Sequence, residues 1–151
     1  MALKKKHRRQ TPSATIPNVV QPESKLLNFS FKHLDCNSEK FALRDCDAEF
    51  WEFLARTLQR YSQQPTSDFQ DQENHEHRHQ ITFETSTELE GFSHLDMDQV
   101  AYLERWQFEV GPHQLGRVHG FLVDDMFYIV WLDPLHRLHL IHPRPANESI
   151  D

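Results

Sequence analysis

The residues best suited to catalysis lie in the last third of the chain. Arg117 and His119 stand two positions apart, Asp133 and His136 follow an apolar run, and His139 comes three residues later. An arginine stabilises negative charge that develops on a phosphate, and histidine or aspartate side chains transfer protons. Together these residue types fit cleavage of a phosphodiester. The structural alternative is an ion pair between Arg117 and Asp133 among surface histidines.

Two predicted strands joined by a tight turn carry this group. Residues 117–123 alternate in character, Asp124 and Asp125 favour a hairpin turn, and residues 127–132 are apolar on both faces, which is typical of a central strand. In an antiparallel hairpin the start of one strand lies beside the end of the next. The catalytic candidates that open the first strand are therefore expected beside those that follow the second, on the sheet face away from the helix.

A histidine-rich segment is the second candidate site. His75, His77 and His79 recur at every second position, and Glu84 follows five residues later. Imidazoles at this spacing share one face of a strand and can bind zinc, iron or nickel. The alternative is a polar, solvated segment. The sequence thus leaves a divalent metal open and gives no reason to expect another cofactor.

The strongest helical pattern lies in the first half of the chain. Phe50, Leu54, Leu58 and Tyr61 recur at helical spacing, which predicts an amphipathic helix over about residues 46–63. Asparagine, aspartate, serine and threonine are the preferred residues at helix N-caps. An aspartate just before the apolar pattern, at position 45 or 47, is therefore the expected cap.

Weaker patterns predict the remaining elements. Pro65 ends the long helix, and Thr66 is a candidate cap for a short second helical turn. Further strands are predicted over residues 26–34, 79–84 and 106–110, and a short helix over residues 97–103.

This order of elements predicts an α+β fold. One long and one or two short helices should pack on one face of a small antiparallel sheet. Residues 25–142 are expected to form a single domain. Residues 1–24 should form a disordered, basic, proline-rich leader and residues 143–151 a loose tail.

Charge and composition narrow the function classes. The 151-residue chain has a formal net charge of −7, and five of its 16 basic residues lie within residues 4–9. The remainder carries 11 basic against 23 acidic residues, a balance that disfavours general nucleic-acid binding by the body of the protein. The longest apolar run, residues 126–132, is far shorter than the about 20 residues of a membrane span. With only Cys36 and Cys46, the chain is expected to be a cytoplasmic protein with reduced thiols and no membrane contact.

Residues 103–139 resemble the RelE/ParE-like toxins. The resemblance rests on three consecutive antiparallel strands, with an arginine at the start of the penultimate strand and a histidine just past the last one. The predicted strand and helix within residues 26–61 agree with that family in order. The chain differs from the family in its greater length, its acidic charge and its histidine-rich insertion.

The resemblance implies a function and a site. The RelE branch cleaves mRNA, typically on the ribosome, through side chains on the concave sheet face. Arg117 takes the position of the strand arginine, and His136, or alternatively His139, takes that of the C-terminal histidine. The implied activity is a metal-independent endoribonuclease, with RNA or the ribosome as target and a protein antitoxin as partner.

Two other functions remain open from the sequence. The acidic body suits a basic protein partner, so the chain is alternatively a non-catalytic binding module: an antitoxin, an inhibitor or an accessory subunit of a mobile-element or defence system. The third hypothesis is a metal-dependent enzyme built on the histidine-rich segment.

Overall fold

The computed structural model describes residues 25–71, 77–96, 98, 102–111 and 115–139. The predicted leader, the predicted tail and most of the predicted helix over 97–103 lie outside these ranges. No helix within them is long and apolar enough to cross a membrane.

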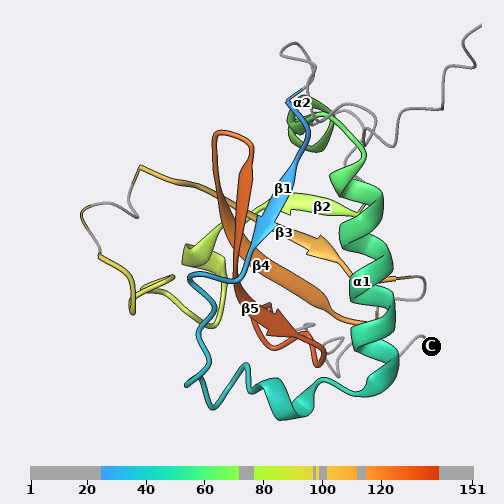
Figure 1. Ribbon diagram of the computed structural model, residues 1–151. Coiled ribbons are helices and arrows are strands. Elements are labelled where there is room, and N and C mark those ends of the chain that lie inside the picture. Colours follow the sequence, from blue (N-terminus) through green and yellow to red (C-terminus); the bar gives the residue numbers. More distant parts are fainter. Residues whose placement is uncertain (1–24, 72–76, 97, 99–101, 112–114, 140–151) are drawn as a thin grey trace, which may run out of the picture.

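A five-stranded sheet forms the centre of the molecule (Figure 1). Its strand order is β1-β5-β4-β3-β2. The neighbours pair antiparallel, except that β1 runs parallel to β5. The strands are β1 (Asn28–Ser30), β2 (Arg78–Gln80), β3 (Glu104–Glu109), β4 (Arg117–Val123) and β5 (Met126–Asp133). The predicted α+β class is confirmed, and the sheet is mixed because of the one parallel pair.

Two of the predicted strands are shorter than expected. The strand predicted over residues 26–34 is reduced to β1. The strand predicted over 79–84 ends at Gln80 and gives way to a 3-10 turn, η3 (Phe83–Thr85). Ile81 and Phe83 are both buried, and they reach the interior from this turn region rather than from a strand.

The long helix forms where the apolar spacing predicts it. Helix α1 (Ala48–Ser62) buries Phe50, Leu54, Thr57 and Tyr61 against the sheet. The Asp47 carboxylate caps it by accepting a hydrogen bond from the Phe50 backbone N–H at 2.8 Å.

Helix α2 (Thr66–Gln70) is also present, but Pro65 rather than Thr66 occupies its N-cap position. The Thr66 hydroxyl instead donates to the Asp125 carboxylate at 2.9 Å. The predicted role of Thr66 as a cap is therefore wrong, because a carboxylate in the β4–β5 turn lies within its reach.

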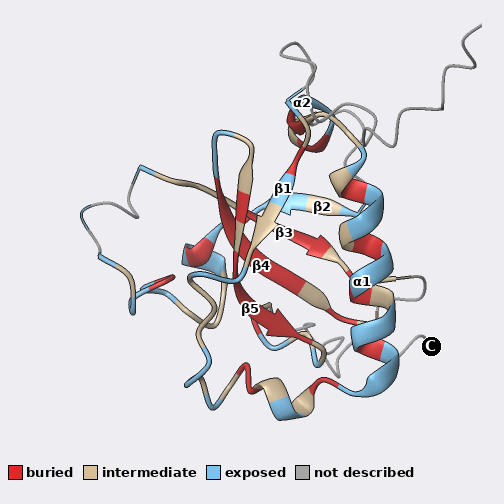
Figure 2. Cartoon of the chain, viewed as in Figure 1, coloured by how far each residue is buried: buried red, intermediate tan, exposed pale blue. Residues whose placement is uncertain are grey.

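Both faces of the sheet are covered (Figure 2). Helix α1 covers one face, over a core that includes Trp106, Phe108 and Phe127. The other face is covered mainly by irregular segments, and its aromatic core is built from side chains on loops and on β4 and β5. The buried members of this second core are Phe41, Ile81, Phe83, Phe92, Phe121, Val130, Trp131 and Leu138.

A β-bulge between β4 and β5 shapes this second face. His119 pairs with Trp131, whereas the next residue, Gly120, pairs with Ile129, so Val130 is the extra residue. The bulge lets Val130 and Trp131 both belong to the second core. Beyond it, Asp133 shares the sheet face of Trp131.

Candidate functional site

Arg117, His119 and Asp133 come together on the sheet face opposite α1. Arg117 on β4 pairs in register with Asp133 on β5, and on the other side His119 lies opposite Gln107 of β3. A Cβ atom added to Gly116 would touch the Pro134 and Asp133 backbone, so β4 begins directly against the chain that leaves β5. The hairpin geometry expected from the sequence is therefore present.

The centre of the group is a buried His–Asp pair. His119 Nε2 lies 3.0 Å from Asp133 Oδ2, and their side chains are 0% and 1% exposed. Asp133 also accepts backbone N–H groups from Arg137 at 2.8 Å and Leu138 at 3.0 Å. The carboxylate thus fixes both the imidazole and the turn that follows β5. The pair has no direct access to solvent.

Burial and hydrogen bonds set the protonation state of the His119–Asp133 pair. Burial lowers the pKa of His119, and the attraction of Asp133 offsets this only in part. Burial acts to raise the pKa of Asp133, but the hydrogen bonds from His119 and from the two backbone donors lower it below its ordinary value. At neutral pH the pair is therefore a neutral imidazole donating to a carboxylate. The second ring nitrogen, His119 Nδ1, then carries a lone pair.

Unpartnered polar atoms gather around this pair. Within the described residues, four buried side-chain atoms have no hydrogen-bond partner: Gln107 Oε1, Arg117 Nε, His119 Nδ1 and His139 Nδ1. Gln107 faces His119 in the β3–β4 register, and His139 interacts electrostatically with both Arg117 and Asp133. Buried polar groups are nearly always hydrogen-bonded, so the gathering of four such atoms around the His119–Asp133 pair is unusual.

His139 is the histidine that reaches Arg117. Burial lowers its pKa first, and the Arg117 guanidinium lowers it further, against opposing effects of a hydrogen bond with the Thr82 backbone and of Asp133. His139 is half-buried, and so is Arg117. A neutral imidazole and a fixed cation therefore lie side by side at the edge of the buried pair.

His136 lies in the turn that follows β5. It adopts a left-handed backbone conformation (φ 54°), which is uncommon for a residue other than glycine. The hydrogen bonds that Asp133 accepts from Arg137 and Leu138 hold the turn around it. Its side chain is half-buried. Local strain of this kind is often found at functional sites.

The nearby thiol is not suited to nucleophilic chemistry. Burial, together with the carboxylates of Asp45, Asp47 and Asp133, raises the pKa of Cys46 to about 11. The thiolate is the reactive form of cysteine, and at neutral pH it is scarce here. The Cys46 thiol is therefore a poor nucleophile in the folded protein.

The residues of the proposed metal site are only partly described. His75 lies outside the described residues. His77 and His79 lie before and within β2, exposed, and Glu84 lies in η3. His77 Nδ1 is 3.0 Å from Glu109 Oε2. Within the described ranges, no group of three or more histidine, cysteine, aspartate or glutamate side chains is arranged to hold a metal ion.

Two members of the group are not among the residues that the sequence suggests. Gln107 belongs to β3, the strand that precedes the hairpin, and Thr82 to a loop far from the hairpin in sequence. The period-2 pattern of β3 puts Gln107 on the face opposite Trp106 and Phe108, which is a usable signal. Nothing local to Thr82 indicates its proximity to His139.

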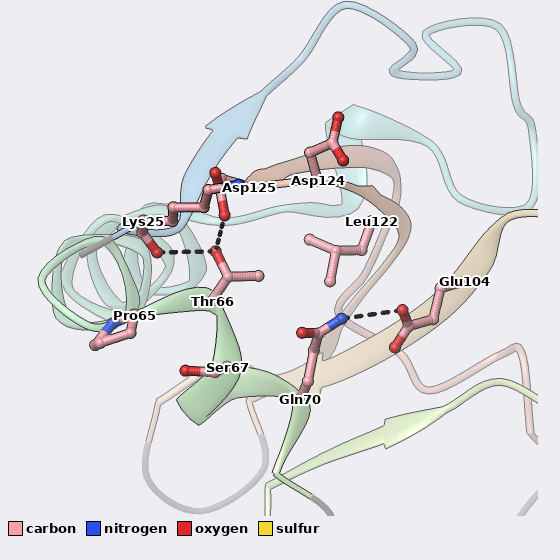
Figure 3. Close-up of a pocket in the computed structure, with 9 residues that line it drawn as sticks. All are labelled: Lys25, Pro65, Thr66, Ser67, Gln70, Glu104, Leu122, Asp124 and Asp125. Atoms are coloured by element: carbon pink, nitrogen blue, oxygen red, sulfur yellow. Dashed lines mark hydrogen bonds between the residues drawn. The ribbon is translucent and has the colours of Figure 1, made fainter. Parts of the chain in front are cut away.

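A separate cavity of about 480 Å³ lies at the opposite end of the sheet (Figure 3). Glu104, Asp124 and Asp125 line it, with Lys25 as the only cation among its lining residues. Gln70 donates to Glu104 at 3.0 Å, and Thr66 donates to Asp125. This end of the molecule is acidic.

Comparison of the chain with protein-family models, with curated proteins and with solved structures finds no match.

Proposed function

We propose that this protein is a metal-independent endoribonuclease of the RelE type, acting through Arg117 and the histidines beside it. The proposal rests on one observation: a half-buried arginine and imidazole adjoin a buried His–Asp pair, amid four buried polar atoms that have no partner. Perturbed titration and unsatisfied polarity in one place are characteristic of catalytic sites.

The residue types favour RNA as the substrate. Cleavage of RNA can use the substrate's own 2′-hydroxyl as nucleophile, so the protein need supply only a base, an acid and a positive charge. Arg117 and His136 provide a charge and an imidazole, and the Cys46 thiol is protonated. The substrate's own hydroxyl therefore removes the need for a protein nucleophile.

Each side chain has a distinct role in the proposal. Arg117 binds the phosphate and stabilises the charge that develops on it. His136 is the proposed acid–base group: it accepts the proton of the 2′-hydroxyl and returns a proton to the leaving oxygen. His139 is a positioning residue, because its Nδ1 is buried and its other ring nitrogen bonds the Thr82 backbone. His119 and Asp133 are positioning residues, because their complete burial keeps them from the substrate.

The distribution of charge favours RNA binding at the end of the sheet that carries Arg117. Four arginines lie where β3 ends, β4 begins and β5 ends, and carboxylates lie among them. The arginines are Arg56, Arg60, Arg117 and Arg137, and the carboxylates are Asp45, Glu52, Glu109 and Asp133. The acidic cavity lies at the other end of β3. An RNA strand would therefore be repelled less at the Arg117 end of the sheet than at the acidic end.

The test is RNA cleavage, with and without ribosomes, by the wild-type protein and by Arg117→Ala. We expect the wild-type protein to cleave in the presence of EDTA and the variant to lose at least about a hundredfold in rate, the scale of losing a charge that stabilises the transition state. Lys32→Ala, which removes an exposed cation elsewhere, is the control and should cleave normally. Equal cleavage by wild-type protein and Arg117→Ala would contradict the assignment.

A second candidate function is favoured by the acidic end. The described residues carry 18 acidic against 10 basic side chains, and the cavity lined by Glu104, Asp124 and Asp125 concentrates three carboxylates. We propose as the alternative a binding module for a basic protein, such as the partner in a toxin–antitoxin pair. Absence of RNA cleavage together with a salt-sensitive complex that is weakened by Asp124→Asn would favour it.

A further inference from the structure

A second cavity lies between α1 and the end of β3. It has a volume of about 410 Å³ and is lined by Phe53, Arg56, Thr57 and Arg60 of α1 together with His77, Glu109 and Gly111. The Gly111 backbone N–H donates to the Thr57 hydroxyl at 3.3 Å, and a Cβ atom at Gly111 would clash with Phe53. Helix α1 and the segment that follows β3 are therefore fixed against each other. The cavity lies at the edge of the core between them.

The cavity is positively charged although the protein is acidic. Arg56 and Arg60 lie one helical turn apart on α1, where two like charges repel each other. The one carboxylate in the lining, Glu109, is 3.0 Å from His77 and is only 16% exposed. The two guanidinium groups are thus the dominant charges of the cavity.

Neither arginine makes a strong interaction within the described part of the protein. Arg56 pairs with Glu52 at 3.0 Å, but the two side chains are 69% and 60% exposed, and such surface pairs are weak. The Arg60 guanidinium lies 5.1 Å from the ring centroid of Tyr61, which orients it by a cation–π contact. Planar guanidinium groups arranged in this way suit the oxygens of a phosphate.

Glu109 connects this cavity to the proposed catalytic group. It pairs with Arg117 across the β3–β4 register, so their Cα atoms are separated by the width of one strand pair, roughly 5 Å. One RNA strand that places a phosphate at Arg117 can therefore extend over the end of β3 toward Arg56 and Arg60.

We propose that the Arg56–Arg60 cavity binds a backbone phosphate of the RNA strand whose scissile phosphate lies at Arg117. This inference rests on the proposed ribonuclease function and adds a second phosphate site to it. The cavity recognises the sugar–phosphate backbone, so it contributes affinity and register along the strand rather than base specificity.

The experiment measures binding of a short 2′-deoxy oligonucleotide, which lacks the attacking hydroxyl and is not cleaved. Wild-type protein is compared with the double variant Arg56→Gln/Arg60→Gln and with the control Lys25→Gln/Lys32→Gln, which removes the same charge elsewhere. Glutamine keeps a good helix propensity, and thermal unfolding checks that each variant is folded. Inorganic phosphate is titrated in parallel as a probe of free-anion binding.

We expect the arginine double variant to bind the oligonucleotide about tenfold more weakly, with a salt dependence shallower by about 0.7 for each phosphate that is no longer neutralised. The control should stay within about twofold of wild type. Unchanged affinity in the arginine variant, or no binding by the wild-type protein, would overturn the inference. Inorganic phosphate binding as tight as the oligonucleotide would do the same, because the cavity would then hold a free anion.

Failure of this inference can be told apart from failure of the proposed function. Oligonucleotide binding that depends on Arg56 and Arg60 without any cleavage of RNA would keep the phosphate site and reject the ribonuclease. RNA cleavage that requires Arg117, together with equal oligonucleotide affinity of the wild-type protein and the arginine variant, would keep the ribonuclease and reject the second site.

Discussion

Among single residues, two histidine–aspartate pairs in this protein differ in environment. His119 and Asp133 are completely buried at 3.0 Å, whereas His94 and Asp35 lie 3.8 Å apart with side chains 32% and 21% exposed. Breaking a buried pair leaves an uncompensated charge in the interior, but a surface charge is solvated by water. The buried pair therefore fixes the turn after β5, and loss of the pair should destabilise that turn.

This difference gives the first expected outcome. His119→Ala should lower the free energy of unfolding by about 3 kcal/mol, because Asp133 is left buried with two backbone donors and no imidazole. The matched change His94→Ala should cost less than about 1 kcal/mol. Urea denaturation measures both. Equal effects of the two substitutions would mean that burial of the first pair contributes nothing.

The lowered pKa values of His119 and His139 predict how stability depends on pH. The unfolded chain takes up protons on these histidines near their ordinary pKa of 6.5, whereas the folded protein does so only at lower pH. Their stabilising contribution is therefore complete above about pH 6.5 and is lost as pH falls through the folded pKa. Asp133, whose folded pKa lies below 3.8, adds a further loss at still lower pH.

Urea midpoints measured between neutral and acidic pH test this expectation. The wild-type midpoint should fall as pH drops below about 6.5, and the fall should be smaller in His119→Ala. A midpoint that rises on mild acidification would show that the folded state binds protons more tightly, contrary to the neutral buried imidazole.

Among the secondary-structure elements, the β4–β5 hairpin is the one that builds the site. Its bulge brings Asp133 onto the face of His119, and it depends on a close approach of the two strands at Gly120. A Cβ atom there would collide with the Tyr128 carbonyl oxygen and the Phe127 ring. No other residue fits without moving β4 away from β5.

Gly120→Ala should therefore destabilise the protein by at least about 2 kcal/mol and weaken the His119–Asp133 contact, because the strands must separate. Val123→Ala, at the exposed end of the same strand, is the control and should cost less than about 1 kcal/mol. Thermal unfolding gives the stability, and the ring resonances of His119 report the contact. A Gly120→Ala protein as stable as the control would contradict the role of the bulge.

The elements that sequence predicts are those with local periodic patterns. Helix α1 and strands β4 and β5 have clear 3.6-residue or two-residue patterns or continuous apolar runs, and their bounds agree closely with expectation. The convergence of Arg117 with Asp133 follows from hairpin geometry alone. The position of the candidate site can therefore largely be predicted from the sequence.

The burial of the candidate site, in contrast, cannot be predicted from local sequence patterns. Phe41 packs against the His119 ring and the Leu138 backbone binds Asp133, and both residues come from irregular segments without periodicity. The parallel pairing of β1 with β5 likewise joins distant parts of the chain. Such long-range contacts depend on the whole fold, so the sequence predicts that His119 and Asp133 lie on the sheet face away from the helix but not that irregular segments bury this face.

Across the molecule, charge is separated along the sheet. The acidic cavity lies at the Glu104 end of β3 and the arginine cavity at the Glu109 end. Five residues of strand span roughly 17 Å, about twice the Debye length of roughly 8 Å at physiological salt. The two ends should therefore act independently under those conditions.

Asp124→Asn tests this independence. Asparagine tolerates the left-handed conformation of Asp124 (φ 51°), so the turn should survive. RNA affinity should change by less than about twofold at physiological salt and by more at about 0.01 M salt, where the Debye length is about 30 Å. A large gain in affinity at physiological salt would show that the acidic end repels RNA directly.

The chemistry proposed for the group around Arg117 and His136 is cleavage of RNA through the substrate's own 2′-hydroxyl. The sharpest test is to identify the product ends after wild-type protein acts on an RNA, beside the same RNA with 2′-deoxyribose at the cleaved position. We expect a 2′,3′-cyclic phosphate from the first substrate, with or without EDTA, and no cleavage of the second. Cleavage of the deoxy-substituted strand, or no cleavage of either, would contradict this mechanism.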